Sequence, residues 1–275
     1  MRLFRTERGV VAEHDGRLVR LDEAWKSLMA RDDLFAYVRD AHAHGAEEPH
    51  LDGRVLAPIA EQEVWAAGVT YVRSRAARME ESRDAGGGSF YDRIYDAQRP
   101  ELFFKSAPWR VRGPGDEVRI RRDARWSVPE PEIALVIDPR GHIIGYTIGN
   151  DMSSRDIEGE NPLYLPQAKI YDGSCALGPA LLLGPEPLPP ETPIEMTVTR
   201  RSEVIVQGST TFGRMRRDPA ALVEYLYRET SFPDGCMLLT GTGVVPADDF
   251  TLCPGDQIRI HVPPIGTLSN VVSDQ

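Results

Sequence analysis

Residues 129–151 read PEPEIALVIDPRGHIIGYTIGND, and this stretch decides the fold. Two apolar runs, 133–137 and 143–148, flank Asp138-Pro-Arg-Gly141, which has the residue pattern of a type I turn. The runs therefore predict an antiparallel hairpin. Alternate side chains of a strand share a face, so Glu130 and Glu132 point the same way, and the register brings Asp151 opposite residues 128–130. We expect three carboxylates to meet at the open end of this hairpin.

Three carboxylates that lie together raise one another's pKa unless a cation neutralises them. Oxygen ligands suit a hard divalent ion, so the cluster predicts a site for Mg²⁺, with Mn²⁺ or Ca²⁺ as alternatives. Zinc is disfavoured, because His142 is the only histidine in this stretch and stands at the tip of the turn. The competing interpretation is that Glu130 and Glu132 lie on a solvated strand face.

The overall composition excludes several classes of protein. The chain has 275 residues and a net charge of −10, and it lacks a basic block, so we expect no nucleic-acid partner. It shows no signal-peptide pattern and no apolar run long enough to span a membrane, so we expect a cytoplasmic protein. Three widely spaced cysteines predict neither a disulfide nor a zinc site.

The remaining pattern predicts a β-rich α+β protein in two parts. A hairpin around residues 14–17 and helical spacing over 21–43 indicate a small N-terminal α/β domain, residues 1–58. Residues 59–275 form the larger domain, where short strands alternate with turns rich in Gly, Pro and Asp.

Two segments of the larger domain stand out. Asp218 followed by a proline predicts the start of a helix that runs to about residue 228. Residues 71–98 contain a helix candidate and the glycine run 86–88, and they indicate a lid over a site. A helix that simply ends in a loose loop is the alternative.

Four other residues could carry chemistry. Arg155 suits the gripping of a substrate carboxylate, although a surface ion pair with Asp156 would explain it equally well. Lys169 lies in an apolar stretch near the cluster and could move protons, unless it is a surface lysine. Glu101 precedes an apolar run, where burial would raise its pKa, or it is exposed. The turn containing Thr242 could offer N–H groups and a hydroxyl to an anion.

In order, these motifs resemble the signature of the fumarylacetoacetate hydrolase superfamily over about residues 60–270. The matching stretches are Glu130-Pro-Glu132, Gly149-Asn-Asp-Met-Ser-Ser-Arg-Asp156, Lys169 and Thr240-Gly-Thr242. The resemblance implies a mixed β-roll catalytic domain, a homodimer or dimer-based tetramer, and a small 2-oxo acid as substrate. It also implies roles for single residues: Glu130, Glu132 and Asp151 hold Mg²⁺ or Mn²⁺, Lys169 lies beside the oxo group of the substrate, and Arg155 and Thr242 bind it.

One departure from the family pattern concerns the lid. Hydrolases of the superfamily carry a water-activating His–Glu dyad after an Asn-Tyr motif, and here Ser74 and Ala77 stand at the matching positions after Thr70-Tyr71. We expect Tyr71 and Ser74 to contact substrate. The surrounding motifs resemble the branch that dehydrates 2-keto-3-deoxy sugar acids in pentose catabolism.

The expected activity is therefore that of a Mg²⁺-dependent hydro-lyase. It would convert a 2-keto-3-deoxy-pentonate to 2,5-dioxopentanoate through a metal-stabilised enolate, with Lys169 and Glu101 as the proton-moving pair. One alternative is a hydrolase, decarboxylase or isomerase of 2,4-dioxo acids, in which Glu80 or Glu81 replaces the missing base. Another is a protein that binds oxo acids without turning them over.

Overall fold

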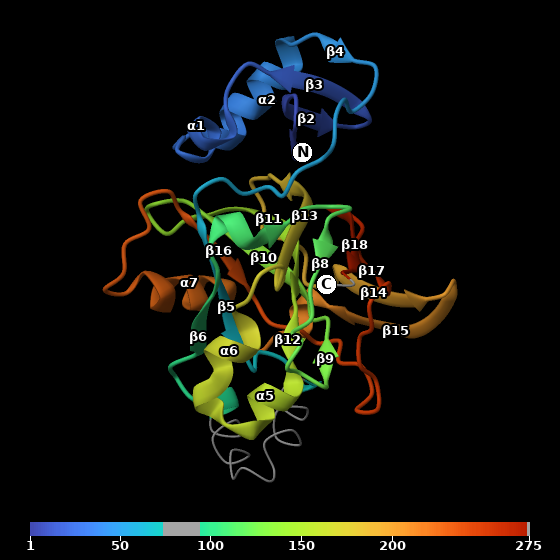
Figure 1. Ribbon diagram of the computed structural model, residues 1–275. Coiled ribbons are helices and arrows are strands. Elements are labelled where there is room, and N and C mark those ends of the chain that lie inside the picture. The colour runs from blue at the N-terminus through green and yellow to red at the C-terminus, as the bar shows by residue number, and fades with distance from the viewer. Residues whose placement is uncertain (74–93, 274–275) are drawn as a thin grey trace.

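The computed structural model describes residues 1–73 and 94–273 (Figure 1). The sequence begins with three strands, two helices and a short fourth strand: β1 (Arg2–Thr6), β2 (Gly9–His14), β3 (Arg17–Leu21), α1 (Trp25–Met29), α2 (Leu34–His44) and β4 (Glu47–Glu48). The predicted hairpin is present, because β2 and β3 pair antiparallel around Asp15-Gly16. The span with helical spacing contains two helices rather than one, since α1 ends at Met29.

The largest sheet has the order β4-β3-β2-β1-β13-β11-β10-β16-β5-β6, and β7 also pairs with β13. Its other strands are β5 (Glu63–Gly68), β6 (Glu101–Ser106), β7 (Val111–Arg112), β10 (Pro131–Ile137), β11 (Ile143–Asp151), β13 (Cys175–Leu182) and β16 (Cys236–Leu239). Most neighbours are antiparallel, but β16 and β5 are parallel, so the sheet is mixed. Because β1 pairs with β13, the N-terminal strands continue this sheet, and a domain boundary at residue 58 stays a prediction.

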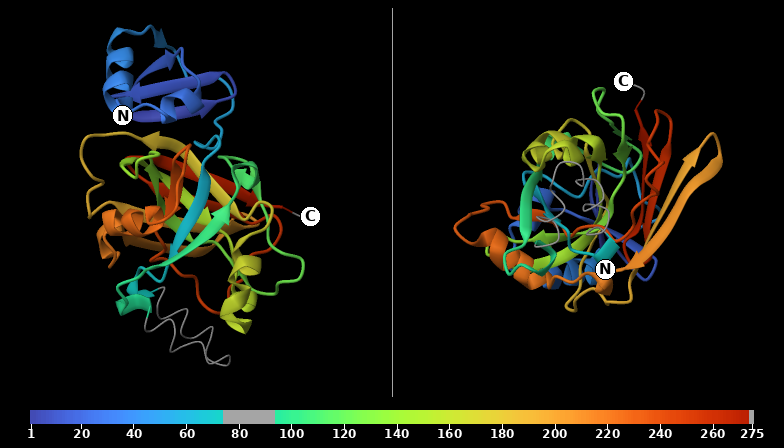
Figure 2. Two further views of the ribbon diagram at one scale, coloured as in Figure 1. Left: turned by 90° about the vertical axis from the view of Figure 1, so that its left-hand side faces the viewer. Right: turned by 90° about the horizontal axis from the view of Figure 1, so that it is seen from below.

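A second sheet of the described residues has the order β15-β14-β17-β18-β8 and packs beside the first (Figure 2). Its strands are β8 (Glu117–Val118), β14 (Pro193–Arg200), β15 (Glu203–Thr211), β17 (Gln257–Val262) and β18 (Gly266–Val272), and a separate pair joins β9 (Ser127–Val128) to β12 (Ser153–Ser154). The remaining helices that lie wholly within the described residues are α5 (Arg155–Glu160), α6 (Leu165–Lys169) and α7 (Pro219–Tyr227), with 3₁₀ turns at Pro108–Arg110, Pro162–Tyr164 and Phe212–Arg214.

The β-rich α+β class predicted from the sequence is confirmed. The Asp218 carboxylate accepts the Ala220 N–H at 3.1 Å, so the predicted cap of α7 is confirmed as well. The described residues contain three free cysteines and no helix long and apolar enough to cross a membrane. Most of the predicted lid falls outside the described residues, as do Ser74, Ala77, Glu80 and Glu81.

Strand β10 lies between two apolar clusters and is buried on both faces. Ile133, Leu135 and Ile137 face the cluster shared with the second sheet, whereas Ala134 and Val136 face the cluster that includes the N-terminal helices. A strand buried on both faces reads as a continuous apolar run, which explains its sequence. The strand that carries Glu132 is therefore packed between two apolar clusters.

The closed end of this hairpin is held by Asp138. The turn is closed by a hydrogen bond from Gly141 N–H to the Asp138 carbonyl at 3.0 Å, as the predicted type I turn requires. The Asp138 carboxylate accepts the N–H groups of Arg140 and His142 at 2.8 and 2.9 Å and pairs with the Arg140 guanidinium at 2.7 Å. Burial alone would raise the pKa of Asp138, but these N–H groups and the guanidinium outweigh it and lower the pKa.

Candidate active site

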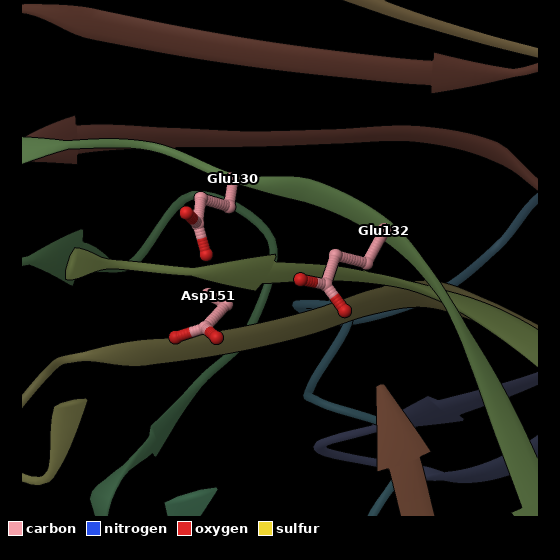
Figure 3. Close-up of side chains that lie close together, drawn as sticks. All are labelled: Glu130, Glu132 and Asp151. Carbon is pink, nitrogen blue, oxygen red and sulfur yellow. The ribbon is translucent and has the colours of Figure 1, made fainter. Parts of the chain in front are cut away.

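A trio of carboxylates lies where β10 begins and β11 ends. Glu132 pairs with Gly149 in the ladder, and the N–H of Asp151 donates to the carbonyl of Glu130 at 3.0 Å. Figure 3 shows the three carboxylates turned toward one another, and one oxygen from each lies within 4.8 Å of the others. All three side chains are buried, which excludes the interpretation as a solvated strand face. The predicted convergence is confirmed.

Lys169 ends α6 and extends its ammonium group into this trio. Its Nζ donates to Glu130 Oε2 at 2.6 Å, to Asp151 Oδ2 at 3.0 Å and to Ser153 Oγ at 2.5 Å. The side chain is 1% exposed, so Lys169 is not a surface lysine. The predicted neighbourhood of Lys169 and the carboxylates is thus present.

Lys105, on β6, is a second buried lysine beside the trio. Its Nζ lies 2.5 Å from Asp151 Oδ1 and donates to the carbonyls of Met152 at 2.9 Å and Lys169 at 2.6 Å. The ammonium group therefore makes one buried ion pair and two hydrogen bonds to carbonyl oxygens. Lys105 connects β6, the end of β11 and the end of α6 at one point.

Arg155 and Glu158 complete the buried cluster from α5. The Arg155 guanidinium contacts Glu130 Oε1 at 2.6 Å, and its Nε lies 3.9 Å from the Glu158 carboxylate. Glu158 also lies 3.5 Å from Lys169 Nζ. Both side chains are almost wholly buried, so the surface ion pair with Asp156 is not what Arg155 makes. In Figure 1, α5 and α6 lie beside β12, at the end of the molecule away from the N-terminal helices.

The glycine-rich turn after β16 contacts Glu132 through its backbone. The Gly241 N–H donates to Glu132 Oε2 at 2.6 Å, so the turn does offer an N–H group to an anion. Gly241 has a φ of +91°, and a Cβ there would meet Thr70 Oγ1 at 2.0 Å, so glycine is required for both reasons. The Thr242 hydroxyl is hydrogen-bonded to Val244, 3.1 Å from its carbonyl and from its N–H.

The electrostatics of the trio favour a bound cation. Burial raises the pKa of Glu132 well above its usual range, and the charges of Asp151 and Glu130 raise it further. Burial also acts to raise the pKa of Asp151, but Lys105 and Lys169 outweigh it, and the pKa is lowered. A buried carboxylate with a raised pKa beside two others marks a place where a divalent ion would relieve repulsion. The donors are all oxygen, which suits Mg²⁺.

Two predicted residues lie at the edge of this cluster. Glu101 begins β6, four residues before Lys105, and the ladder between β5 and β6 is irregular at Lys105. It is half-buried, and its carboxyl packs on Gly68, where a Cβ would meet Oε2 at 2.0 Å. Tyr71 is buried, and burial together with the charge of Glu132 raises the pKa of its phenol.

Lys105 and Glu158 are the members that sequence reasoning missed. A signal for Lys105 exists, because the chain has 32 Lys and Arg residues but only three lysines, at positions 26, 105 and 169. In a chain that otherwise uses arginine, each lysine draws attention, and two of the three, Lys105 and Lys169, are buried. Glu158 follows Arg155 by three residues, which places both on one helix face, but nothing local indicates that this face is buried.

Comparison with known proteins gives the family. The model for the fumarylacetoacetate (FAA) hydrolase C-terminal family matches residues 64–273. The chain belongs to this family. The superfamily resemblance read from the motifs is therefore confirmed.

Similar members of the family are dehydratases by name. The "Probable 2-keto-3-deoxyxylonate dehydratase" of Haloferax volcanii is 46% identical over 82% of this chain and 78% of its own. The 2-dehydro-3-deoxy-D-arabinonate dehydratase of Saccharolobus solfataricus is 43% identical, over 79% of this chain and 74% of its own. The solved structure of 2-keto-3-deoxy-D-arabinonate dehydratase complexed with magnesium and 2,5-dioxopentanoate matches with a TM-score of 0.85, 36% identity and 99% coverage of both chains. The expected likeness to the sugar-acid dehydratases is confirmed.

Proposed function

We propose that the protein is a Mg²⁺-dependent hydro-lyase that converts a 2-keto-3-deoxy-pentonate to 2,5-dioxopentanoate and water. The observation that carries the proposal is the buried trio with Lys169 set between Glu130 and Asp151. Similarity to the named dehydratases supports the substrate class. The residues at the dyad positions, Ser74 and Ala77, support a reaction that activates no water.

Glu130, Glu132 and Asp151 would hold the ion. Mg²⁺ bound there supplies Lewis-acid polarisation of the 2-oxo group, which makes the neighbouring C3 proton more acidic. The Gly241 N–H fixes one oxygen of Glu132, and Lys105 fixes one oxygen of Asp151, so both carboxylates are oriented before any ion binds.

The other residues bind the substrate and move its protons. Arg155 presents donors for the substrate carboxylate, and Thr242, Tyr71 and Ser74 would line the rest of its path. Lys169 and Glu101 exchange protons with the substrate: a proton leaves C3, and the hydroxyl leaves C4 with a proton as water, which gives a C3=C4 double bond conjugated to the 2-oxo group. Transfer of a proton from C5 to C3 then gives the C5 enol, which tautomerises to the 5-oxo compound.

We infer in addition that the protein works in the cytoplasm as a homodimer or as a tetramer built from dimers. Sedimentation equilibrium tests the assembly, because a dimer has twice the chain mass of 30.6 kDa. A monomer at micromolar concentration would contradict this part of the proposal.

The test is a Mg²⁺-dependent assay with 2-keto-3-deoxy-pentonates, in which the aldehyde of 2,5-dioxopentanoate is followed by a coupled reaction. Product should form, and it should vanish with a chelator and in Glu132→Gln. Glu203→Gln, an exposed glutamate on β15, is the matched control and should keep full activity.

An acylpyruvate is assayed in parallel. Its turnover in place of the sugar acids would mean a hydrolase of 2,4-dioxo acids and would refute the dehydratase. Binding of 2-oxo acids without turnover of any would mean a non-catalytic binding protein.

Deuterium exchange assigns the base. In D₂O the unreactive analogue 2-oxopentanoate should gain deuterium at C3 with the wild-type protein but not with Lys169→Met. Exchange at the wild-type rate in Lys169→Met, together with its loss in Glu101→Gln, would give the C3 step to Glu101.

A further inference from the structure

A cavity of about 420 Å³ lies outside the candidate active site, where β7 and β8 approach the end of β18. Three arginines, two acids and a serine line it: Arg54, Arg112, Arg119, Asp116, Glu117 and Ser273. No member of the buried cluster around Lys169 is among them. β7 and β11 pair with β13 on its two edges, so β13 lies between this cavity and the ladder position of Asp151. Figure 1 shows β8 beside β18, above α5 and α6.

The charge of Arg54 is already paired. Its guanidinium contacts Glu7 Oε1 at 3.1 Å and Asp116 Oδ1 at 2.8 Å. The other oxygen of Asp116 accepts the Gly113 N–H at 2.7 Å. Both oxygens of Asp116 are therefore engaged with partners other than the remaining two arginines.

Arg112 and Arg119 keep unused donors. Among the described residues, neither guanidinium makes a hydrogen bond or lies within ion-pair distance of a carboxylate, Glu117 included. The Nε of Arg112 is enclosed and has no hydrogen-bond partner, although an enclosed N–H group without a partner costs free energy. Glu117 is exposed, so water screens its charge. An oxyanion in the cavity would give both guanidinium groups the partners they lack.

The backbone holds these two arginines in place. Arg112 pairs with Ala176 in the ladder between β7 and β13. The Arg119 N–H donates to the Gly173 carbonyl at 3.0 Å, and its side chain packs on Gly173, where a Cβ would meet Arg119 Cγ at 3.0 Å. A ligand therefore meets donors on fixed backbone, which lowers the entropy cost of binding.

We propose that this cavity binds a phosphate-type dianion between the guanidinium groups of Arg112 and Arg119. A dianion matches two cations that lack partners, and the planar guanidinium suits phosphate oxygens. Small-molecule sites span about 300–1,000 Å³, so the cavity has room for a small phosphate monoester as well as for free phosphate. The site is separate from the proposed function and stands or falls without it.

Two ligands test the proposal: inorganic phosphate and glycerol 3-phosphate. Binding is measured by calorimetry on metal-free protein in EDTA, so that no metal ion holds the phosphate. Two charge-assisted contacts predict a dissociation constant at or below about 5 mM. Binding of the ester at least about tenfold more tightly would assign the site to a phosphate monoester, because its organic part then contributes. Equal affinities would assign it to free phosphate.

The variants Arg112→Gln and Arg119→Gln should each weaken binding by at least about tenfold, because each removes a charged donor. Arg122→Gln is the matched control, since it makes the same change at an exposed arginine three residues after Arg119. It should bind like the wild-type protein. Without ligand, Arg112→Gln should melt at least as high as the wild-type protein, because its loss breaks no hydrogen bond or ion pair of the described residues.

Two results would overturn the proposal. Heats that do not saturate at about ten times the expected dissociation constant would mean that phosphate associates with the surface only. Affinities of Arg112→Gln and Arg119→Gln that equal the affinity of Arg122→Gln would place the anion elsewhere, at the donors of Arg155 for example. Neither result depends on turnover, so failure of the dehydratase assay leaves the anion site untouched.

Discussion

Replacing Lys105 by methionine should destabilise the protein even when no metal is present. Methionine nearly matches the length of the lysine side chain but donates no hydrogen bond. The change removes the ion-pair partner of Asp151 Oδ1 and the ammonium donor of the buried carbonyls of Met152 and Lys169, of which the Lys169 carbonyl still accepts from the Ser174 hydroxyl at 2.9 Å. The effect should therefore appear as a lower free energy of unfolding.

The expected size follows from the partners that remain. Removing one member of a buried ion pair costs about 3–5 kcal/mol, because the other charge is left uncompensated. Here Lys169 still reaches Asp151 Oδ2 at 3.0 Å, so we expect the lower end, about 3 kcal/mol. For a domain of this size that corresponds to a fall in melting temperature of about 6–12 °C.

The assay is thermal unfolding followed by circular dichroism in buffer with EDTA, so that no metal contributes to the difference. Lys26→Met is the matched control, because the Lys26 side chain is 57% exposed. Its melting temperature should equal that of the wild-type protein. A Lys105→Met variant that melts within about 2 °C of this control, a shift worth less than about 1 kcal/mol, would show that the three contacts of Lys105 do not stabilise the fold.

Four further predictions concern the metal, the turns and acid. Glu132→Gln should weaken Mn²⁺ binding, measured by electron paramagnetic resonance, by at least about 100-fold, and an unchanged affinity would place the ion elsewhere. Saturating Mg²⁺ at about 100 times its Kd should add about 2.7 kcal/mol of stability over EDTA, and identical melting curves would contradict a resident ion. Gly241→Ala should lower the free energy of unfolding by about 3 kcal/mol or more, and the control Gly255→Ala by about 1 kcal/mol. Both glycines have a positive φ, but of the two only Gly241 lacks room for a Cβ. Equal losses of stability in chemical denaturation would refute this prediction. Because the pKa of Asp138 is lowered in the folded protein, its contribution to the free energy of unfolding is complete above its ordinary pKa of 3.8 and is lost as the pH falls through the lower folded value. The free energy of unfolding should therefore exceed that of Asp138→Asn by about 1 kcal/mol at neutral pH, and this difference should vanish in acid. A difference that grows below pH 3 would contradict the direction of the pKa shift.

The hairpin was predictable because local rules settle it. Period-two alternation and the turn at Asp138 fix which residues of β10 and β11 face each other, and thereby place Glu130 beside Asp151. That Lys169 lies beside the carboxylates was predicted only from the order of the motifs, because α6 is not part of the hairpin. Local pattern is strongest where both strands of a pair are neighbours in the sequence.

The contacts that escaped prediction join distant segments. Lys105 reaches Asp151 from β6, which lies at the far edge of the large sheet order, and no periodicity within β6 indicates that partner. The pairing of β1 with β13 likewise joins the first residues to positions 181 and 182. Such pairings form only when the whole sheet is assembled, so local sequence patterns do not predict them.

The scarcity of lysine has a practical consequence for studying this protein in solution. An amine-selective acylating reagent should label the exposed side chain of Lys26 in the native state, while Lys105 and Lys169, with their ammonium groups enclosed, stay unmodified. Mass spectrometry of the labelled peptides then reports when the enclosed pair becomes reachable. Two natural residues thus serve as built-in probes of how often the interior opens, without any introduced label.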